Sequence, residues 1–134
     1  MNGLQAYQRV NTQTSITDAD PHKLIQLLYS GAIERINMAK ARIQARDFEG
    51  KGKLICKALE IIGGLRGFLD FDNGGDLAVR LEALYDYMER ALSQANAKND
   101  IAKLDEVIEL LRSIKEGWDG IREEVVTQHS QAAG

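Results

Sequence analysis

The chain has 134 residues, of which 44% are hydrophobic and 28% are charged, and its formal net charge is −3. This length predicts one domain with a single core, and the small net charge argues against nucleic-acid binding, which usually needs a strongly basic face. No apolar run resembles a signal peptide or reaches the ~20 residues of a membrane span, and the lone cysteine cannot form an internal disulfide, so we expect a cytoplasmic protein without membrane insertion.

Residues 1–20 are interpreted as an N-terminal arm and connector. Residues 3–10 (GLQAYQRV) have the spacing of a short helix with Leu4, Tyr7 and Val10 along one edge, and a polar segment follows them. A helix this short is marginal in water and needs a surface on which to dock. We expect the arm to be a displaceable cover over apolar surface, with Tyr7 as its anchor.

The first two long helices are expected to begin at aspartates. Asp20 precedes Pro21, a pair typical of a helix N-terminus, and the apolar spacing predicts a helix from there to about residue 46. Asp47 is expected to begin the second helix after a very short break. We interpret Gly63 and Gly67 in this helix as a point of close helix contact, because an interior glycine otherwise costs up to ~1 kcal/mol.

The third helix is expected to follow a reversal at residues 71–76 (FDNGGD), with Asp76 as its cap. Its predicted core stripe is Leu77, Leu81, Leu84 or Tyr85, Met88, Ala91 or Leu92, and Ala95. Two residues in sequence correspond to about 200° around a helix. We therefore place Tyr85 beside the core and Tyr87 on the far side, where Tyr87 becomes a candidate for partner contact.

The last helix has the most regular apolar pattern. A turn is expected at residues 96–100 (NAKND), with Asp100 as the cap, and Leu104, Leu111 and Trp118 fall on the core face of the helix that follows. Residues 127–134 have little to bury and are expected to fray. Short turns make neighbouring helices antiparallel, so residues 21–126 are predicted to form an all-α, antiparallel up-down four-helix bundle.

Charge is distributed unevenly along the predicted bundle. Lysine and arginine outnumber aspartate and glutamate in residues 21–66, whereas the acids are in excess in residues 70–124. Opposite charges favour contact. We expect this polarity to help the basic and acidic halves pack side by side, or to orient a partner, rather than to bind nucleic acid.

The residue pattern contains no recognisable catalytic or metal site. A di-iron bundle needs Glu-x-x-His on two helices, whereas the only histidines are His22 and His129. Cys56 lies on an apolar helix without a neighbouring histidine, so we expect a buried structural thiol. The prediction is a protein that is not an enzyme, with no catalytic residue, no metal ligand and no cofactor.

The second and third helices carry apolar residues around a wider arc than the three positions in seven that a bundle helix needs. The arm could cover this surplus, or it could be ordinary surface hydrophobicity. Two other interpretations are a groove for a partner's amphipathic helix and a contact with a second copy of the chain, in a homodimer or larger structural oligomer. The residue types alone leave these alternatives open.

Several segments together resemble the flagellar secretion chaperone family of the FliS type. They are residues 24–33 (LIQLLYSGAI), 74–78 (GGDLA), 84–88 (LYDYM), 95–96 (AN) and 99–100 (ND). No single segment is specific, but their order and spacing match from Tyr7 to Trp118. Arg80, where the family usually carries asparagine, and Gly63-Gly64, in place of better helix formers, depart from the pattern.

This resemblance implies a cytoplasmic four-helix-bundle chaperone without catalysis. Its expected client is the disordered C-terminal segment of flagellin, which it would keep from polymerising and help to deliver to the flagellar export gate, with possible contact to a gate component. The client would fold as it binds, and the folded segment would cover the apolar groove of the chaperone. From the motifs and the helix geometry, the expected client-binding residues are Tyr7, Leu24, Leu27, Leu28, Tyr29, Ile33 and Tyr87.

Overall fold

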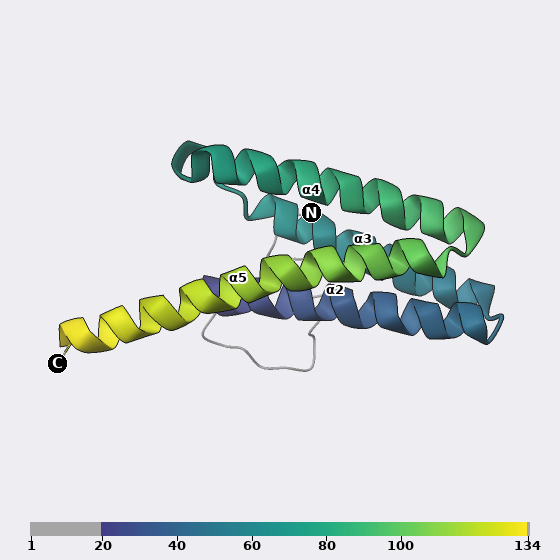
Figure 1. Ribbon diagram of the computed structural model, residues 1–134, viewed down its shortest axis with the longest axis horizontal. Coiled ribbons are helices and arrows are strands. Elements are labelled where there is room, and N and C mark those ends of the chain that lie inside the picture. The colour runs from purple at the N-terminus through teal and green to yellow at the C-terminus, as the bar shows by residue number, and fades with distance from the viewer. Residues whose placement is uncertain (1–19, 134) are drawn as a thin grey trace.

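The computed structural model describes the backbone of residues 20–133 and the side chains of residues 20–120. Within this range the protein consists of four helices and has no strand: α2 (Pro21–Gln44), α3 (Phe48–Gly67), α4 (Phe71–Lys98) and α5 (Ile101–Ala133) (Figure 1). The all-α prediction is confirmed. The arm, with Tyr7, lies outside the described residues, and its expected role stays a prediction.

The four helices form an antiparallel bundle in which each helix has two neighbours. α2 packs against α3 and α5, and α4 also packs against α3 and α5, so α2 and α4 face each other across a diagonal of the bundle. α5 continues past the start of α2 to Ala133 and diverges from α4 in that direction (Figure 1). The segment that was expected to fray after residue 126 is therefore helical as far as Ala133, and its fraying stays a prediction.

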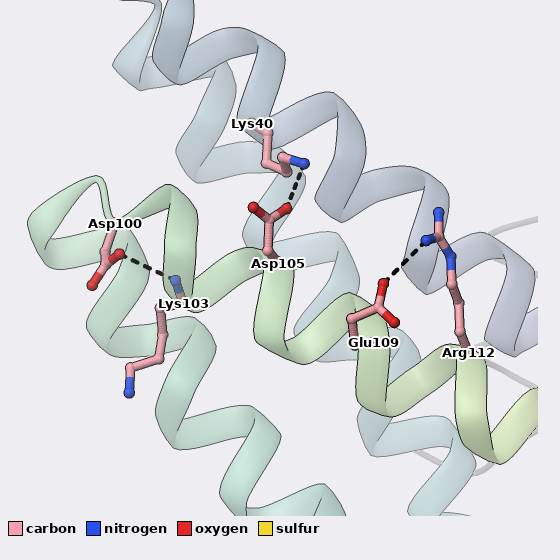
Figure 2. Close-up of polar contacts among 6 residues, drawn as sticks. All are labelled: Lys40, Asp100, Lys103, Asp105, Glu109 and Arg112. Carbon is pink, nitrogen blue, oxygen red and sulfur yellow. Dashed lines mark hydrogen bonds and ion pairs between the residues drawn. The ribbon is translucent and has the colours of Figure 1, made fainter.

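Three of the four helix starts coincide with the aspartates expected from the sequence. Side-chain oxygens of Asp20, Asp47 and Asp100 each accept a hydrogen bond from a backbone N–H two or three residues further on, at 2.9–3.1 Å. The Asp100 bond is drawn in Figure 2. Each carboxylate satisfies a backbone donor that has no partner inside its helix, which is why these starts are readable from the sequence.

The start of α4 differs from the prediction. Asp70, not Asp76, is the cap, and its Oδ1 accepts from the backbone N–H groups of Asp72 and Asn73 at 3.1 Å. The hydrogen bonds from the Asn73 side chain and backbone lower the pKa of Asp70. Gly75, with φ of 51°, then interrupts the helix as a kink. The glycine pair at residues 74–75 was expected to lie in a turn before the helix. It lies inside α4 instead, because Asp70 already caps the turn that precedes it.

The buried core follows the predicted stripes apart from the segment after this kink. Leu77, expected in the core, is 60% exposed, and Ala78 is buried in its place. Leu77 shares the face of α4 that carries Leu81 and Tyr85, but it lies in the first turn after the kink, at the end of the bundle, and so is less covered than they are. On α5, Leu104 and Leu111 are fully buried, and Trp118 is partly buried at the edge of the core.

Two predictions for α3 are wrong. Cys56 is exposed, because Ile55 beside it points into the core and consecutive residues lie about 100° apart around a helix. Gly63 is not a close contact, since a methyl group added there would meet nothing within 4 Å, and Gly67 is exposed. Gly64 is the buried glycine of this segment.

The basic and acidic halves meet through ion pairs between helices. Lys40 Nζ of α2 lies 2.5 Å from Asp105 Oδ1 of α5 (Figure 2), and Arg66 of α3 lies 3.2 Å from Glu89 of α4. This confirms the expected side-by-side packing. Partly exposed pairs of this kind contribute at most about 1 kcal/mol each, so they orient the halves more than they hold them together.

Lys51 makes the one buried charged contact in the part of the chain whose side chains are described. It is 6% exposed, and its Nζ donates to the Asn96 carbonyl at 2.7 Å and to Asn99 Oδ1 at 2.6 Å. Both acceptors lie at the C-terminus of α4, where the helix dipole favours a cation. Lys51 thus ties the first turn of α3 to the last turn of α4.

We expect Lys51→Met to lower the free energy of unfolding by about 1.5–3 kcal/mol, the usual contribution of hydrogen bonds to a charged group. Urea denaturation followed by circular dichroism measures this loss. Lys53→Met is the matched control: its side chain is 77% exposed and pairs only with Glu49, at 3.6 Å, so it should change the unfolding free energy by less than about 0.5 kcal/mol. Equal losses in the two variants would contradict a special role for Lys51.

Candidate functional site

An apolar cavity lies at the end of the bundle where α2 begins and α3 ends. Its volume is about 330 Å³, at the lower limit of the roughly 300–1,000 Å³ that is usual for ligand pockets. All four helices contribute to its walls. A space of this size suits a few apolar side chains rather than a whole helix.

One side of the cavity is formed by α2 and the end of α3. α2 contributes Ile25 and Tyr29, which are four residues apart and therefore share a face of the helix. α3 contributes Leu65, and Phe68 and Leu69 follow in the turn after it. These side chains continue the core stripes to the point where the bundle ends.

The other side is formed by α4 and α5. Leu77, Leu81 and Tyr85 of α4 recur every four residues and so line up along the cavity. From α5 come two turns of residues, Ser113, Ile114, Gly117 and Trp118. A methyl group added at Gly117 would meet nothing within 4 Å. Because glycine has no side chain, there is free space beside α5 at this position of the cavity wall.

Two tyrosine hydroxyl groups meet within this apolar lining. The Tyr29 and Tyr85 oxygens are 2.5 Å apart, and each residue is only 2% exposed. The bond joins α2 to α4 across the diagonal of the bundle, where the helices themselves are not neighbours. Burial raises the pKa of both tyrosines, most strongly that of Tyr85. Both side chains therefore stay neutral at physiological pH.

The tryptophan at the rim of the cavity is held by the first turn of α2. Trp118 Nε1 donates to the His22 carbonyl at 3.0 Å, and the two rings stack with centroids 4.1 Å apart. Next to it, Asp119 accepts from Gln26 of α2 and from Lys115 of α5, both at 2.6 Å. Partial burial opposes ionisation of Asp119, but these hydrogen bonds outweigh it and lower its pKa.

The chemistry available in the cavity is that of a binding site. Its lining offers apolar contact and hydroxyl groups. Among the described residues, no three histidine, cysteine, aspartate or glutamate side chains are grouped so that they could hold a metal ion. In the same part of the chain, no helix has the length and apolar character needed to cross a membrane.

A second depression lies between α2 and α5. It is larger, about 720 Å³, and includes Ile33 and the exposed side chain of Met38. Charged side chains, among them Glu34, Arg112 and Lys115, form much of its lining. Arg112 also pairs with Glu109 at 3.2 Å (Figure 2). Because these charges remain hydrated, the depression is less suited to apolar side chains than the cavity at the bundle end.

The residues expected to bind a client are distributed over several parts of the fold. Of those in the described range, only Tyr29 lines the cavity. Leu24 and Leu28 are buried in the core, and Leu27 packs partly buried against it. Ile33 belongs to the second depression. The structure does not bring these residues together on one surface.

Tyr87 is exposed, on the opposite side of α4 from the buried Tyr85. Its hydroxyl donates to the carboxylate of Glu106 on α5, and this hydrogen bond raises the pKa of Tyr87. The contact bridges two helices on the outer face of the bundle. Tyr87 therefore lies away from the cavity, and its contact with a client stays a prediction.

Most residues of the cavity were not among the sequence predictions. Leu81 had been placed in the core stripe of its helix, but not at this end of the bundle. The available signal was the position of the cavity residues along each helix: in an antiparallel bundle, the first turns of α2 and α4 meet the last turns of α3. The apolar stripe of each helix, together with the position of its residues along that helix, would have indicated that apolar side chains gather at the end of the bundle where α2 begins.

Comparison with known proteins gives consistent matches over nearly the whole chain. The model of the family described as flagellar protein FliS matches residues 3–125. The flagellar secretion chaperone FliSB of Pseudomonas aeruginosa is 47% identical over 121 residues, which cover 90% of this chain and 96% of that protein. The flagellar secretion chaperone FliS of Vibrio cholerae is 47% identical over 118 residues, covering 88% and 87%. That of Salmonella typhimurium is 38% identical over 131 residues, covering 97% of both chains.

We expect Trp118→Ala to lower the free energy of unfolding by about 1–3 kcal/mol, less than the ~3–5 kcal/mol of a fully buried aromatic residue, because Trp118 is only partly buried. Trp118→Phe keeps a ring against His22 but loses the Nε1 donor, and should cost about 1 kcal/mol. Urea denaturation of both variants tests this order. If both unfold like the parent protein, Trp118 does not stabilise this end of the bundle.

Proposed function

This chain belongs to the FliS family of flagellar secretion chaperones, and from that premise we propose that its client is the disordered C-terminal segment of flagellin. Binding in the cytoplasm would keep flagellin from polymerising prematurely and assist its delivery to the flagellar type III export apparatus, where a gate component is a further partner. The curated relatives are named as chaperones, and the proposed role involves no chemical reaction.

The observation that supports this proposal most is the apolar cavity at the bundle end. Its lining comes from all four helices, and Leu77 of this lining, at the start of α4, is 60% exposed and so extends the apolar surface into solvent. An amphipathic helix that places its apolar face in such a groove buries both surfaces. A client segment that is disordered when free would gain its structure at the same time.

We propose that the first client contact is made in this cavity, with Tyr29, Leu81 and Trp118 in its walls. Leu24 and Leu28, which are buried, would support the site from the core. Ile33 and Tyr87 lie on other faces of the bundle. They would meet the client only where it continues around the outside of the helices.

Isothermal titration calorimetry with a synthetic peptide of the flagellin C-terminal segment tests the client. We expect a negative change in heat capacity, the mark of apolar burial, and a gain of peptide helix in circular dichroism. Absence of binding at about 100 µM peptide, well above the ~µM dissociation constant of a useful complex, would contradict the proposal.

Gly117→Phe tests the location of the site. The new ring has open space, and phenylalanine is a better helix former than glycine, so we expect the bundle to stay as stable while the peptide binds at least about tenfold more weakly, a loss of ~1.4 kcal/mol. Gly120→Phe is the matched control, because Gly120 is equally open but does not line the cavity. Equal affinities of the two variants would place the client elsewhere.

The same variants distinguish the client from self-association, the alternative function for exposed apolar surface. Sedimentation of the protein at several concentrations, without peptide, reports its oligomeric state. A dimer that dissociates in Gly117→Phe, together with unchanged peptide binding, would assign the cavity to a second copy of the chain.

A further inference from the structure

The buried tyrosine pair has one more hydrogen-bond donor than its own contact uses. Two hydroxyl groups carry two protons, and one of these protons lies in the bond between Tyr29 and Tyr85. The hydroxyl that accepts this bond keeps its own proton. Within the described part of the chain, neither tyrosine makes a further hydrogen bond.

The two tyrosines that carry this remaining donor both line the cavity, and each is only 2% exposed. Burying two hydroxyl groups is unfavourable unless both are satisfied, and two phenylalanines would fill nearly the same volume without this cost. A water molecule in the cavity of the free protein would accept a hydrogen bond from the remaining hydroxyl. A client that fills the cavity removes that solvent and must replace its hydrogen bond.

We propose that the tyrosine pair selects clients that place a neutral carbonyl oxygen on it while apolar side chains fill the rest of the cavity. This inference rests on the proposed function, since it concerns the same client, and it adds a polar requirement to an otherwise apolar contact. Tyr29 and Tyr85 are then binding residues as well as core residues.

The lining of the cavity favours a neutral acceptor over a carboxylate. Among the described residues that line it, none is a lysine, arginine or histidine. A buried carboxylate without a cation would lose its hydration for a single hydroxyl donor. A carbonyl of a side-chain amide or of the client backbone loses less hydration and accepts the same bond. The burial that raises the pKa of both tyrosines keeps them in the donating, protonated form.

The test removes the hydroxyl groups without removing the rings. Tyr29→Phe/Tyr85→Phe eliminates both donors at once, and replacing both partners of a buried hydrogen bond is close to neutral for stability. We expect this double variant to unfold like the parent and to bind the flagellin C-terminal peptide about 3- to 10-fold more weakly in calorimetry. Either single variant keeps one donor and should bind within about twofold of the parent. Ser93→Ala, which removes an exposed hydroxyl outside the cavity, should bind like the parent.

Changes in the peptide identify the acceptor. In one series, each asparagine and glutamine of the peptide is replaced by leucine; in the other, single backbone amides are replaced by esters, whose carbonyls accept more weakly. One replacement should weaken binding to the parent protein about 3- to 10-fold and have little effect on the double variant, which is the coupling expected of a direct contact. If the double variant does not fold, the replacements are tested on the parent protein alone: one of them must weaken binding about 3- to 10-fold, and the absence of any such replacement would overturn the role of the hydroxyls.

The outcomes separate this inference from the proposed function. Peptide binding by the parent protein with equal affinity for the double variant would overturn the role of the hydroxyls and leave the client assignment standing. A weaker double variant without coupling to any peptide replacement would also overturn it, since the loss would then come from altered packing. Absence of binding by the parent protein itself would instead contradict the client.

Discussion

The packing of the Tyr29 and Tyr85 rings in the core, with their hydroxyl groups joined, is the contact around which the cavity end of this bundle is built. It crosses the diagonal between α2 and α4, which are not neighbours in the bundle. Both rings are buried and line the cavity. Toward the other end, the buried residues of the same two helices include Ala39 and Ala95, which fill far less volume. The end with the two tyrosines, the open end, holds the cavity.

Polar contacts reinforce this difference between the two ends. At the opposite end, Lys51 donates to the backbone carbonyl of Asn96 and to the side-chain Oδ1 of Asn99, and so fixes the turn into α5. At the open end, the contacts of Trp118 and Asp119 with α2 hold the wall of the cavity in position. The buried stripes supply most of the stabilisation, since apolar burial is the dominant favourable contribution to folding. The hydrogen bonds decide where the helices start, stop and touch.

A chaperone for a disordered segment needs a surface that is apolar, yet compatible with a soluble free protein. In the proposed role the cavity would supply such a surface, because all four helices contribute apolar side chains to its walls and several of these, such as Tyr29 and Leu65, are buried. Leu77, at the start of α4, carries this apolar surface into solvent. Leu77 lies in the first turn after the kink at Gly75, on the same face of α4 as Leu81 and Tyr85, so it extends the surface that the proposed client would cover.

The amino-acid sequence by itself determined the fold class, three of the four helix caps and most of the core, because these depend on local interactions. An aspartate caps the turn that follows it, and the 3.6-residue period selects the buried face, as for Leu104 and Leu111. The family was also readable, since it rests on the order of short segments along the chain. Only the tertiary structure decided which apolar residues meet. Tyr29 and Tyr85 lie 56 positions apart and join only across the bundle diagonal, and the exposure of Cys56 and Leu77 depends on helix rotation and on a position at the end of the bundle, respectively. Periodicity records the face of each helix, whereas a binding site depends on how four faces are rotated and placed against one another, and that is settled by packing over the whole molecule.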